Sequence, residues 1–414
     1  YTIDKSFFNI TYNTEEKLNE AMALGREGTL EELQAELSDI AANGRSFDIE
    51  YTIAAPDFTK FAAGIAAEVN TAPVDATFGV KQLEMNKATD ALDAVNIGKA
   101  DDDTVTDLRD LRFDFVEGIP GHGVNEQKLI DELTARTEAR EFGTVEFESE
   151  PIEPEVTIAT IKETLVMRSS AYTSYAKGHY GRAERVHNMT KACGMIYGTV
   201  LQPGDVLSCN TLLGDRYEKY GWQLAPAVIE GGANTEDQPG GGVCQVSTTL
   251  YSAALCAGMT ITSRTPHSMP VSYISLGQDA TVNDMRGHEI DLAFTNKTGG
   301  RVYITAGIEP TPSGRKQCVV RFFGQAMPDN ATYKLESTIV EKLEIPEDII
   351  KKDKDAKYVT YEDQKHKVSS GSEGYVVKTY LQYCKNGVVQ SQTLISTDTY
   401  RARAAVYYVG VTPR

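Results

Sequence analysis

The stretch Gly240-Gly241-Gly242-Val243-Cys244-Gln245-Val246-Ser247-Thr248-Thr249-Leu250-Tyr251 decides the fold around it. Its three glycines lack Cβ atoms, so the backbone can turn sharply and let another molecule approach closely. Apolar residues then recur at helical spacing as far as Ala257, and Gly258 stands where a helix commonly ends. The pattern predicts a buried helix preceded by an open glycine loop, with Cys244 in the first helical turn.

Cys244 is the candidate nucleophile. Unpaired N–H groups and the positive end of the helix dipole favour a thiolate over a thiol at such a position. The alternative is a small, buried apolar residue, which is what most free cysteines are. The six histidines show no zinc spacing, and we expect no metal and no other cofactor. The six cysteines, at 193, 209, 244, 256, 318 and 384, form no CxxC pair and no compact disulfide framework, so their spacing proposes no disulfide but leaves pairing open.

A histidine and an aspartate follow Cys244 in the chain. His267 comes after a proline between two expected strands, 259–263 and 271–274, so a short rigid turn should hold it. Asp279 lies a few residues further on. The three residues supply a thiol nucleophile, a general base and an acceptor that orients the base. Sequence order does not show proximity, and each histidine or aspartate alone is more often structural.

Several neighbours are weaker candidates for substrate binding. The backbone N–H groups of Gly241, Gly242 and Cys244 could stabilise an oxyanion. For Gln245 and Tyr251 the alternative to substrate contact is helix packing or capping. Trp222, the single tryptophan, is more often a core anchor, but beside a glycine-rich loop it could line a groove.

Length and charge bound the rest of the chain. A chain of 414 residues predicts two to four domains. Up to Glu155 there are 34 acidic and 13 basic residues, a net of −21, and the remainder has 25 acidic and 28 basic residues, a net of +3. The acidic front disfavours nucleic acid and anionic membrane as partners, and a solvated surface explains it best. No apolar run is long enough to span a membrane.

The front reads as an α+β domain. Strands are expected at 7–12, 47–51 and 144–148, and helices at 14–24, 30–42, 57–69 and 125–137. Asp101-Asp102-Asp103 lacks EF-hand spacing, so a solvated loop is favoured over a calcium site. We expect a binding or spacing domain here, and a connecting stretch over 156–182 after it.

Three parts of the chain resemble known bacterial modules. LQPGDVLSCNTLLGDR, GGGVCQVSTTLY, RTPHS, GQDATV and AFTNKTGGRVYI, in this order over about 182–310, closely resemble the VanW-type domain of cell-envelope proteins. The front, through AMALGREG, is similar to the peptidoglycan-binding domain that often precedes it. The tail, about 334–412, resembles the G-five (G5) module of surface proteins. Its two alternating strands are joined through Lys385-Asn386-Gly387, and the Asn-Gly pair by itself predicts a β-hairpin turn.

These resemblances imply an extracytoplasmic envelope protein of a Gram-positive-type bacterium, held by an N-terminal anchor upstream of Tyr1. Some VanW-domain proteins resemble cysteine-dependent L,D-transpeptidases. The family's motif residues fall on Cys244, on His267 with Ser268 beside it, and on Asp279. The predicted class is α+β and multidomain: an α+β domain over 1–155, a mixed α+β catalytic-type domain over 156–332 and a small all-β module over 333–414.

The implied partners are peptidoglycan stem peptides and glycan, with no nucleic acid and with membrane contact only through the anchor. Two other functions stay open from the sequence. The protein could bind the wall without catalysis, with Cys244 merely buried. It could also be a cysteine peptidase or carboxypeptidase that uses water as the acceptor, because that difference depends on how well the pocket excludes water.

Overall fold

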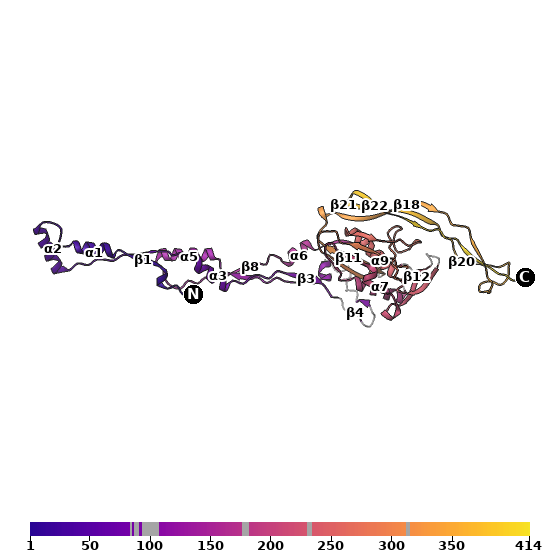
Figure 1. Cartoon of the computed structure of the whole chain (residues 1–414), viewed down its shortest axis with the longest axis horizontal. Helices are drawn as coiled ribbons and strands as arrows, with labels where there is room; N and C mark the ends of the chain where they lie inside the picture. Colours follow the sequence, from indigo (N-terminus) through magenta and orange to yellow (C-terminus); the bar gives the residue numbers. More distant parts are fainter. Residues whose placement is uncertain (83–84, 87–90, 93–106, 176–181, 230–233, 312–314) are drawn as a thin grey trace. The chain divides into compact units, whose positions relative to one another are not determined.

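The computed structural model describes residues 1–82, 85–86, 91–92, 107–175, 182–229, 234–311 and 315–414 (Figure 1). The class is α+β and multidomain, with an all-β C-terminal module, as the sequence predicts. Two compact units emerge. The first combines Tyr1–Thr77 with Glu117–Thr157, and the second combines Phe78–Val116 with Ile158–Arg414. The expected acidic loop Asp101-Asp102-Asp103 lies outside the described residues.

The first unit consists of short helices and two-stranded ribbons. Its strand pairs are antiparallel, namely β1 (Asn9–Tyr12) with β2 (Tyr51–Ala54) and β7 (Gly121–Gly123) with β8 (Glu150–Ile152). Its helices are α1 (Thr14–Ala23), α2 (Leu30–Asn43), α3 (Thr59–Val69) and α5 (Glu126–Ala139), with a 3-10 turn at Lys5–Phe7. The strand predicted over 144–148 is absent. Its alternation reflects the packing of Val145 and Phe147 against the core rather than strand pairing.

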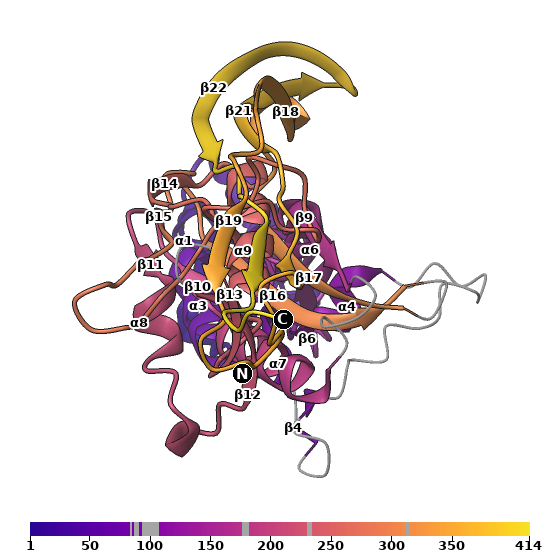
Figure 2. The same cartoon turned by 90° about the vertical axis from the view of Figure 1, so that its right-hand side faces the viewer.

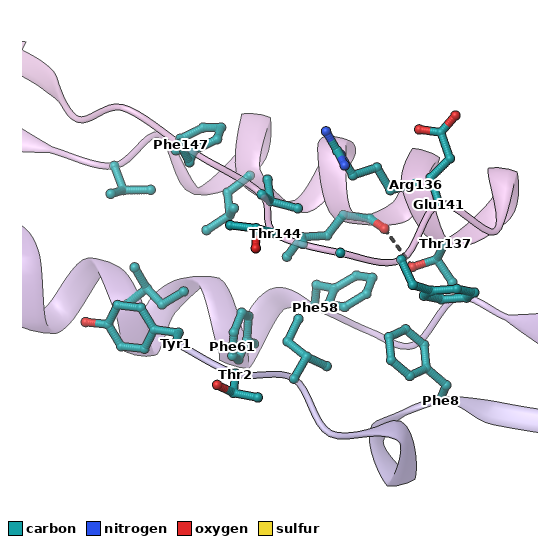
Figure 3. A pocket seen from close by; sticks show the side chains of 18 of the residues that line it. Tyr1, Thr2, Phe8, Phe58, Phe61, Arg136, Thr137, Glu141, Thr144 and Phe147 are labelled. Carbon is teal, nitrogen blue, oxygen red and sulfur yellow. Dashed lines mark hydrogen bonds between the residues drawn. The ribbon is translucent and has the colours of Figure 1, made fainter.

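The core of the first unit is small and incompletely filled. Phe58, Ala62, Leu129 and Leu133 are its buried residues, and they come from the start of α3 and from α5. A cavity of about 660 Å³ lies beside them, with Phe8, Phe61 and Phe147 among its lining side chains and Arg136, Glu141 and Thr144 at its polar edge (Figure 3). α1 and α2 bury no residue, so this unit gains less from apolar burial than its length would allow.

The second unit is built on a four-stranded antiparallel sheet. The order is β10-β16-β17-β9, from β10 (Val200–Leu201), β16 (Val302–Pro310), β17 (Lys316–Gly324) and β9 (Val166–Ser174). The prediction that residues 156–182 only connect two domains is therefore wrong. This stretch contains α6 (Ile158–Thr164) and β9. The stretch alternates weakly because Ser169 and Thr173 occupy buried positions that usually hold apolar residues.

Helix α9 (Val243–Cys256) packs on β9 and β17 of this sheet, and α7 (Ala183–Ile196) packs on β16. Hydroxyl groups fix α9 in place. Ser169 Oγ donates to Ala253 O at 2.7 Å, and the hydroxyls of Thr173 and Thr249 lie 2.8 Å apart. Small residues on both surfaces let the helix approach the strand closely, which is why this hydroxyl-rich helix can be buried.

Smaller elements complete this part of the second unit. A second sheet has the order β11-β15-β14, and β12 pairs with β13 in a hairpin. No strand forms over 271–274, where we predicted one; the chain bends there instead. The bounds are α8 (Cys209–Leu213), β11 (Val206–Ser208), β12 (Leu224–Ile229), β13 (Asn234–Pro239), β14 (Thr260–Ser263), β15 (Ala293–Thr295) and a 3-10 turn at Glu218–Tyr220.

Residues 78–116 belong with this sheet rather than with the front. Phe113 is buried and packs edge-on against Tyr303 of β16 and Phe323 of β17. Arg112 is also buried and forms an ion pair with Glu309 at 2.6 Å. The predicted boundary at 155/156 does not coincide with this division, so the three predicted module limits stay predictions. The segment holds β3 (Thr77–Val80), β4 (Met85–Asn86), β5 (Ala91–Leu92), α4 (Leu108–Arg112) and β6 (Phe113–Val116).

The C-terminal part is all β, apart from a 3-10 turn at Pro328–Asn330. Three long strands, β18 (Thr332–Leu343), β21 (Gly374–Lys385) and β22 (Val388–Tyr400), curve together at the top of Figure 2. The predicted hairpin between β21 and β22 is present, with Asn386 and Gly387 at φ of 51° and 78° as its turn. A second sheet has the order β19-β23-β20, from β19 (Ile349–Lys352), β23 (Val406–Val409) and β20 (Lys365–Ser369).

Within the part of the chain that the structure describes, none of the helices combines the length and the apolar character that a membrane span requires.

We predict that Phe113→Ala destabilises the second unit. The substitution removes a ring that is 1% exposed and leaves a cavity against β16 and β17, which costs about 3–5 kcal/mol. Urea unfolding followed through amide exchange in these strands measures the loss. Val116→Ala is the control, because Val116 is 61% exposed and its change should stay within about 0.5 kcal/mol. Unaltered stability of β16 and β17 in Phe113→Ala would contradict the assignment of this segment.

Candidate active site

Cys244 is the second residue of α9, as the sequence predicts. The glycines before it are buried, so the loop is not open as we expected. A Cβ on Gly241 would lie 2.1 Å from Ala225 O of β12, and one on Gly242 would lie 2.9 Å from the Arg185 side chain of α7. Gly242 also caps the helix at a φ of 110°. The glycines therefore let the start of α9 pack directly against its neighbours.

The half-buried thiol of Cys244 has two polar partners. It hydrogen-bonds the side chain of His267, and its sulfur lies 3.5 Å from Val282 O. Burial alone would raise its pKa, but the hydrogen bond and the positive charge of His267 outweigh burial, and Arg216 adds a further positive charge. The net effect lowers the pKa of the Cys244 thiol, which favours a thiolate at neutral pH.

His267 and Asp279 are in direct contact. Asp279 Oδ2 accepts hydrogen bonds from His267 Nδ1 and from the His267 backbone N–H, both at 2.6 Å. Burial opposes a charge on the imidazole, but the hydrogen bonds with Asp279 and Cys244 raise the pKa of His267 to about 9. Burial likewise opposes the carboxylate, yet the hydrogen bond and charge of His267 hold the pKa of Asp279 below its usual value. The three groups favour a thiolate, an imidazolium and a carboxylate in sequence.

The hydroxyls of α9 hold the segment that carries Asp279. Ser247 Oγ donates to Ala280 O at 2.8 Å, and Thr248 Oγ1 accepts from the Ala280 N–H at 3.0 Å. The Thr281 N–H donates to Thr265 O at 2.8 Å, which ties the aspartate segment to the histidine turn. Ser247 and Thr248 thus hold the segment of Asp279 against the helix that carries Cys244.

Two backbone N–H groups at the start of α9 have no acceptor within the described part of the chain. Gly241 is not a donor there, because its N–H already donates to Gln238 O at 3.1 Å. Among the residues that the structure describes, no acceptor is present for the N–H groups of Gly242 and Cys244. Both lie at the positive end of the α9 dipole, which adds to their attraction for a negative oxygen.

The structure also places the remaining sequence candidates. Gln245 is fully buried and links α7 to β9, accepting from Arg185 at 3.2 Å and donating to Thr173 at 3.1 Å. Tyr251 is 3% exposed. Trp222 is 2% exposed in the core cluster and also lines an open hollow with His187 and Asp237. Ser268 is half-buried next to His267, and its carbonyl accepts from the Arg401 N–H at 2.9 Å.

Sequence reasoning missed several charged and aromatic neighbours of this site. Arg264 stacks on the Tyr251 ring at 5.2 Å and donates to Asp279 O at 2.7 Å. The Tyr273 ring stands edge-on to the His267 ring, with centroids 6.4 Å apart. Tyr400 from β22 donates to Asp279 Oδ1. Arg264 lies in the RTPHS motif and could have been noticed there, but nothing near Tyr400 signals a site.

Among the described residues, His, Cys, Asp and Glu side chains do not gather in groups of three or more that could hold a metal ion.

Family comparisons agree with the motifs. Residues 184–313 match the family model of VanW like proteins, and residues 336–412 match that of the G5 domain. The chain therefore carries a VanW-like domain followed by a G5 domain, in the predicted order. Cys244, His267 and Asp279 all lie within the VanW-like match. The two domains indicate a cell-wall-associated, extracellular protein.

Individual relatives cover parts of the chain. The uncharacterized protein YoaR of Bacillus subtilis (strain 168) is 28% identical over 169 residues, or 41% of this chain and 54% of that protein. The chain thus spans about half the length of this curated relative. The structure of HP0197-G5 is 21% identical, covers 19% of this chain and 97% of that chain, and has a TM-score of 0.12. The IgA1 protease G5 domain is 20% identical, with 20% and 92% coverage and a TM-score of 0.15.

We predict that iodoacetamide at neutral pH labels Cys244 faster than any other cysteine. The best internal comparison is Cys256, which is also half-buried but whose pKa burial raises to about 11. At pH 7 such a thiol is ionised to only about one part in ten thousand. Peptide mapping after timed quenching gives both rates. His267→Ala should slow the labelling of Cys244 alone; equal rates at Cys244 and Cys256 would contradict an activated thiol.

Proposed function

We propose that this protein is a cysteine-dependent L,D-transpeptidase that cross-links peptidoglycan stem peptides. The observation that carries the proposal is that His267 interacts with the Cys244 thiol and is held through its Nδ1 atom by the buried carboxylate of Asp279. This is the arrangement that acyl transfer through a thioester requires: a nucleophile, an acid–base group and a group that orients it. The VanW-like match and the cell-wall association support peptidoglycan as the class of substrate.

The first half-reaction forms a thioester. The Cys244 thiolate attacks a stem-peptide carbonyl at an L-centre, and the carbonyl π electrons move onto its oxygen. The N–H groups of Gly242 and Cys244 stabilise this oxyanion, an effect worth about 3 kcal/mol per donor in comparable sites. When the intermediate collapses, the C–N bond breaks and the His267 imidazolium gives its proton to the leaving amine of D-alanine.

The second half-reaction forms the cross-link. The side-chain amine of a second stem attacks the thioester carbonyl, and the neutral His267 imidazole takes the proton that the amine loses. The C–S bond breaks, and the sulfur leaves as a thiolate. The imidazolium and thiolate with which the cycle began are restored. In both half-reactions Asp279 binds the Nδ1 atom of His267, so the other nitrogen of the imidazole faces the sulfur.

The front of the chain has a separate role at the cell wall in this proposal. The acidic front, residues 1–155, is proposed to bind peptidoglycan without catalysis, and an N-terminal anchor is proposed to tether the protein. The proposed partners are the stem peptides and the glycan of peptidoglycan. The negative net charge of residues 1–155 disfavours nucleic acid as a partner. Wall binding alone and hydrolysis of the thioester by water are the competing functions.

The functional test uses muropeptides that carry tetrapeptide stems. We expect the protein to release D-alanine and to form cross-linked dimers. Mass spectrometry detects both products. Cys244→Ala should abolish both products, and Cys244→Ser should do nearly the same, because a hydroxyl gains little from a site suited to a thiolate. His267→Ala should slow the reaction by about two to four orders of magnitude, and Asp279→Asn by less if it only orients the histidine.

Each alternative gives a different product pattern. Release of D-alanine without dimers would assign a carboxypeptidase. Binding to muropeptides with no product would leave a wall-binding protein. Full activity of Cys244→Ala would eliminate the thiol mechanism. Ser247→Ala should be compared separately, since it removes the hydrogen bond to Ala280 O but leaves the reacting groups in place.

We also predict different pH limits for acylation and alkylation. Thioester formation needs the imidazolium as an acid, and the pKa of His267 is about 9, so release of D-alanine should fall as the pH rises through about 9. Alkylation by iodoacetamide needs only the thiolate and should not fall there. Both reactions should fall on the acid side, where the Cys244 thiolate is protonated. A common alkaline decline would show that the protein itself unfolds, which circular dichroism at the same pH would detect.

A further inference from the structure

The carboxylate that orients His267 is completed by a different module of the chain. Asp279 has no exposed surface, and its Oδ2 atom is used by His267. The other oxygen, Oδ1, accepts a hydrogen bond from the hydroxyl of Tyr400. Tyr400 is the last residue of β22, in the G5 domain, and it is also fully buried. A buried carboxylate without such a donor would be costly, so this contact matters to Asp279.

The direction of the Tyr400 hydrogen bond follows from its second partner. The Gly277 N–H lies 2.6 Å from the Tyr400 oxygen and can only donate. The hydroxyl therefore accepts from Gly277 and gives its own hydrogen to Asp279. Tyr400 thus fixes both ends of the short Gly277–Asp279 segment. It is a positioning residue, because it reaches the reacting atoms only through Asp279 and His267.

A second pair, Arg264 with Asp398, connects the same two domains. Both side chains are 7% exposed, and the Arg264 Nη1 atom lies 2.7 Å from both carboxylate oxygens of Asp398. The other side of the guanidinium faces Asp279, with Nε donating to the Asp279 backbone carbonyl at 2.7 Å and Nη2 lying 3.6 Å from Oδ1. Arg264 thus pairs closely with Asp398 and only loosely with the Asp279 carboxylate, whose Oδ2 atom is bonded to His267.

The two surfaces are closely fitted as well as charged. A Cβ on Gly277 would lie 2.1 Å from Thr379 Oγ1 of β21, and that hydroxyl donates to Gly277 O at 3.1 Å. On the histidine side, the Arg401 N–H donates to Ser268 O. The G5 domain therefore contacts both the turn that holds His267 and the segment that holds Asp279.

From these contacts we propose that the G5 domain is a structural part of the active site, in which Tyr400 and Asp398 position the His267–Asp279 pair. The inference rests on the proposed acid–base role of that pair and adds a determinant outside the VanW-like domain. Removing either contact should let Asp279 turn away from His267 or be neutralised by Arg264. The imidazolium would then lose its partner, and the thiolate would lose the imidazolium.

The test measures two titrations in the full-length protein. The first is the pH dependence of iodoacetamide labelling at Cys244, and the second is the titration of His267 by NMR with labelled histidine. Tyr400→Phe keeps the ring and removes only the hydroxyl. We expect the midpoint for Cys244 to rise and that for His267 to fall, each by about one pH unit, which is about tenfold in labelling rate at a fixed pH below the midpoint. Asp398→Asn should shift both midpoints in the same directions.

Tyr375→Phe is the matched control. Tyr375 lies directly opposite Tyr400 in the β21–β22 pairing, but its hydroxyl donates to the exposed Glu373. We expect it to leave both midpoints unchanged. The titratable or charged groups of this site are Cys244, Tyr251, Arg264, Tyr273, Asp279, Asp398, Tyr400 and, beside the thiol, Arg216, and each variant changes only one residue and leaves the others unaltered.

The outcomes separate this inference from the proposed function. Unshifted midpoints in folded Tyr400→Phe and Asp398→Asn would overturn the positioning role, even if muropeptides are cross-linked. Shifted midpoints in a protein that forms no cross-links would support the positioning role while the transpeptidase assignment fails. If Tyr400→Phe does not fold, Asp398→Asn decides. An equal shift in Tyr375→Phe would mean a general loosening of the G5 domain and would also overturn the inference.

Discussion

The buried carboxylate of Asp279 is the constraint on which the site depends. An ionised carboxylate in the interior must have donors on both oxygens, or the structure pays a desolvation cost of several kcal/mol. Its donors come from His267 on one side and from Tyr400 on the other, so the two domains must meet at this residue. The hydrogen bonds of this one buried charge therefore hold both the His267 ring and the end of β22 in the G5 domain.

The buried hydroxyl groups of α9 likewise need hydrogen-bond partners. A buried helix with Ser247, Thr248 and Thr249 in one run would be unfavourable unless each hydroxyl found a partner. The first two bond Ala280, and the third bonds Gln245 O and faces Thr173. These residues cost little stability because they replace apolar packing with specific hydrogen bonds, and they place the aspartate segment at a fixed distance from Cys244.

Much of this site could be predicted from the sequence, because its signals are local. The helix of Cys244, its glycine start and the strand–turn–strand hairpin through Asn386-Gly387 all follow from short-range rules. The remaining features could not be predicted, because they depend on contacts distant in sequence. Tyr400 lies 121 residues after Asp279 and reads only as the end of a strand. Strand β9 could not be predicted for a related reason, because its inward hydroxyls gain hydrogen-bond partners only when α9 packs on it.

The two cysteines of α9 show that position, rather than residue type, decides thiol chemistry here. Cys256 ends the helix, where the dipole is negative, and burial raises its pKa to about 11. Cys244 begins the same helix and is likewise desolvated, yet the pKa of its thiol is lowered. The difference arises from His267, whose charge depends in turn on Asp279. Since burial opposes ionisation at both ends, a thiolate is favoured only where opposite charges offset that cost, and the carboxylate at the end of this series of charges is bonded by a tyrosine of the G5 domain.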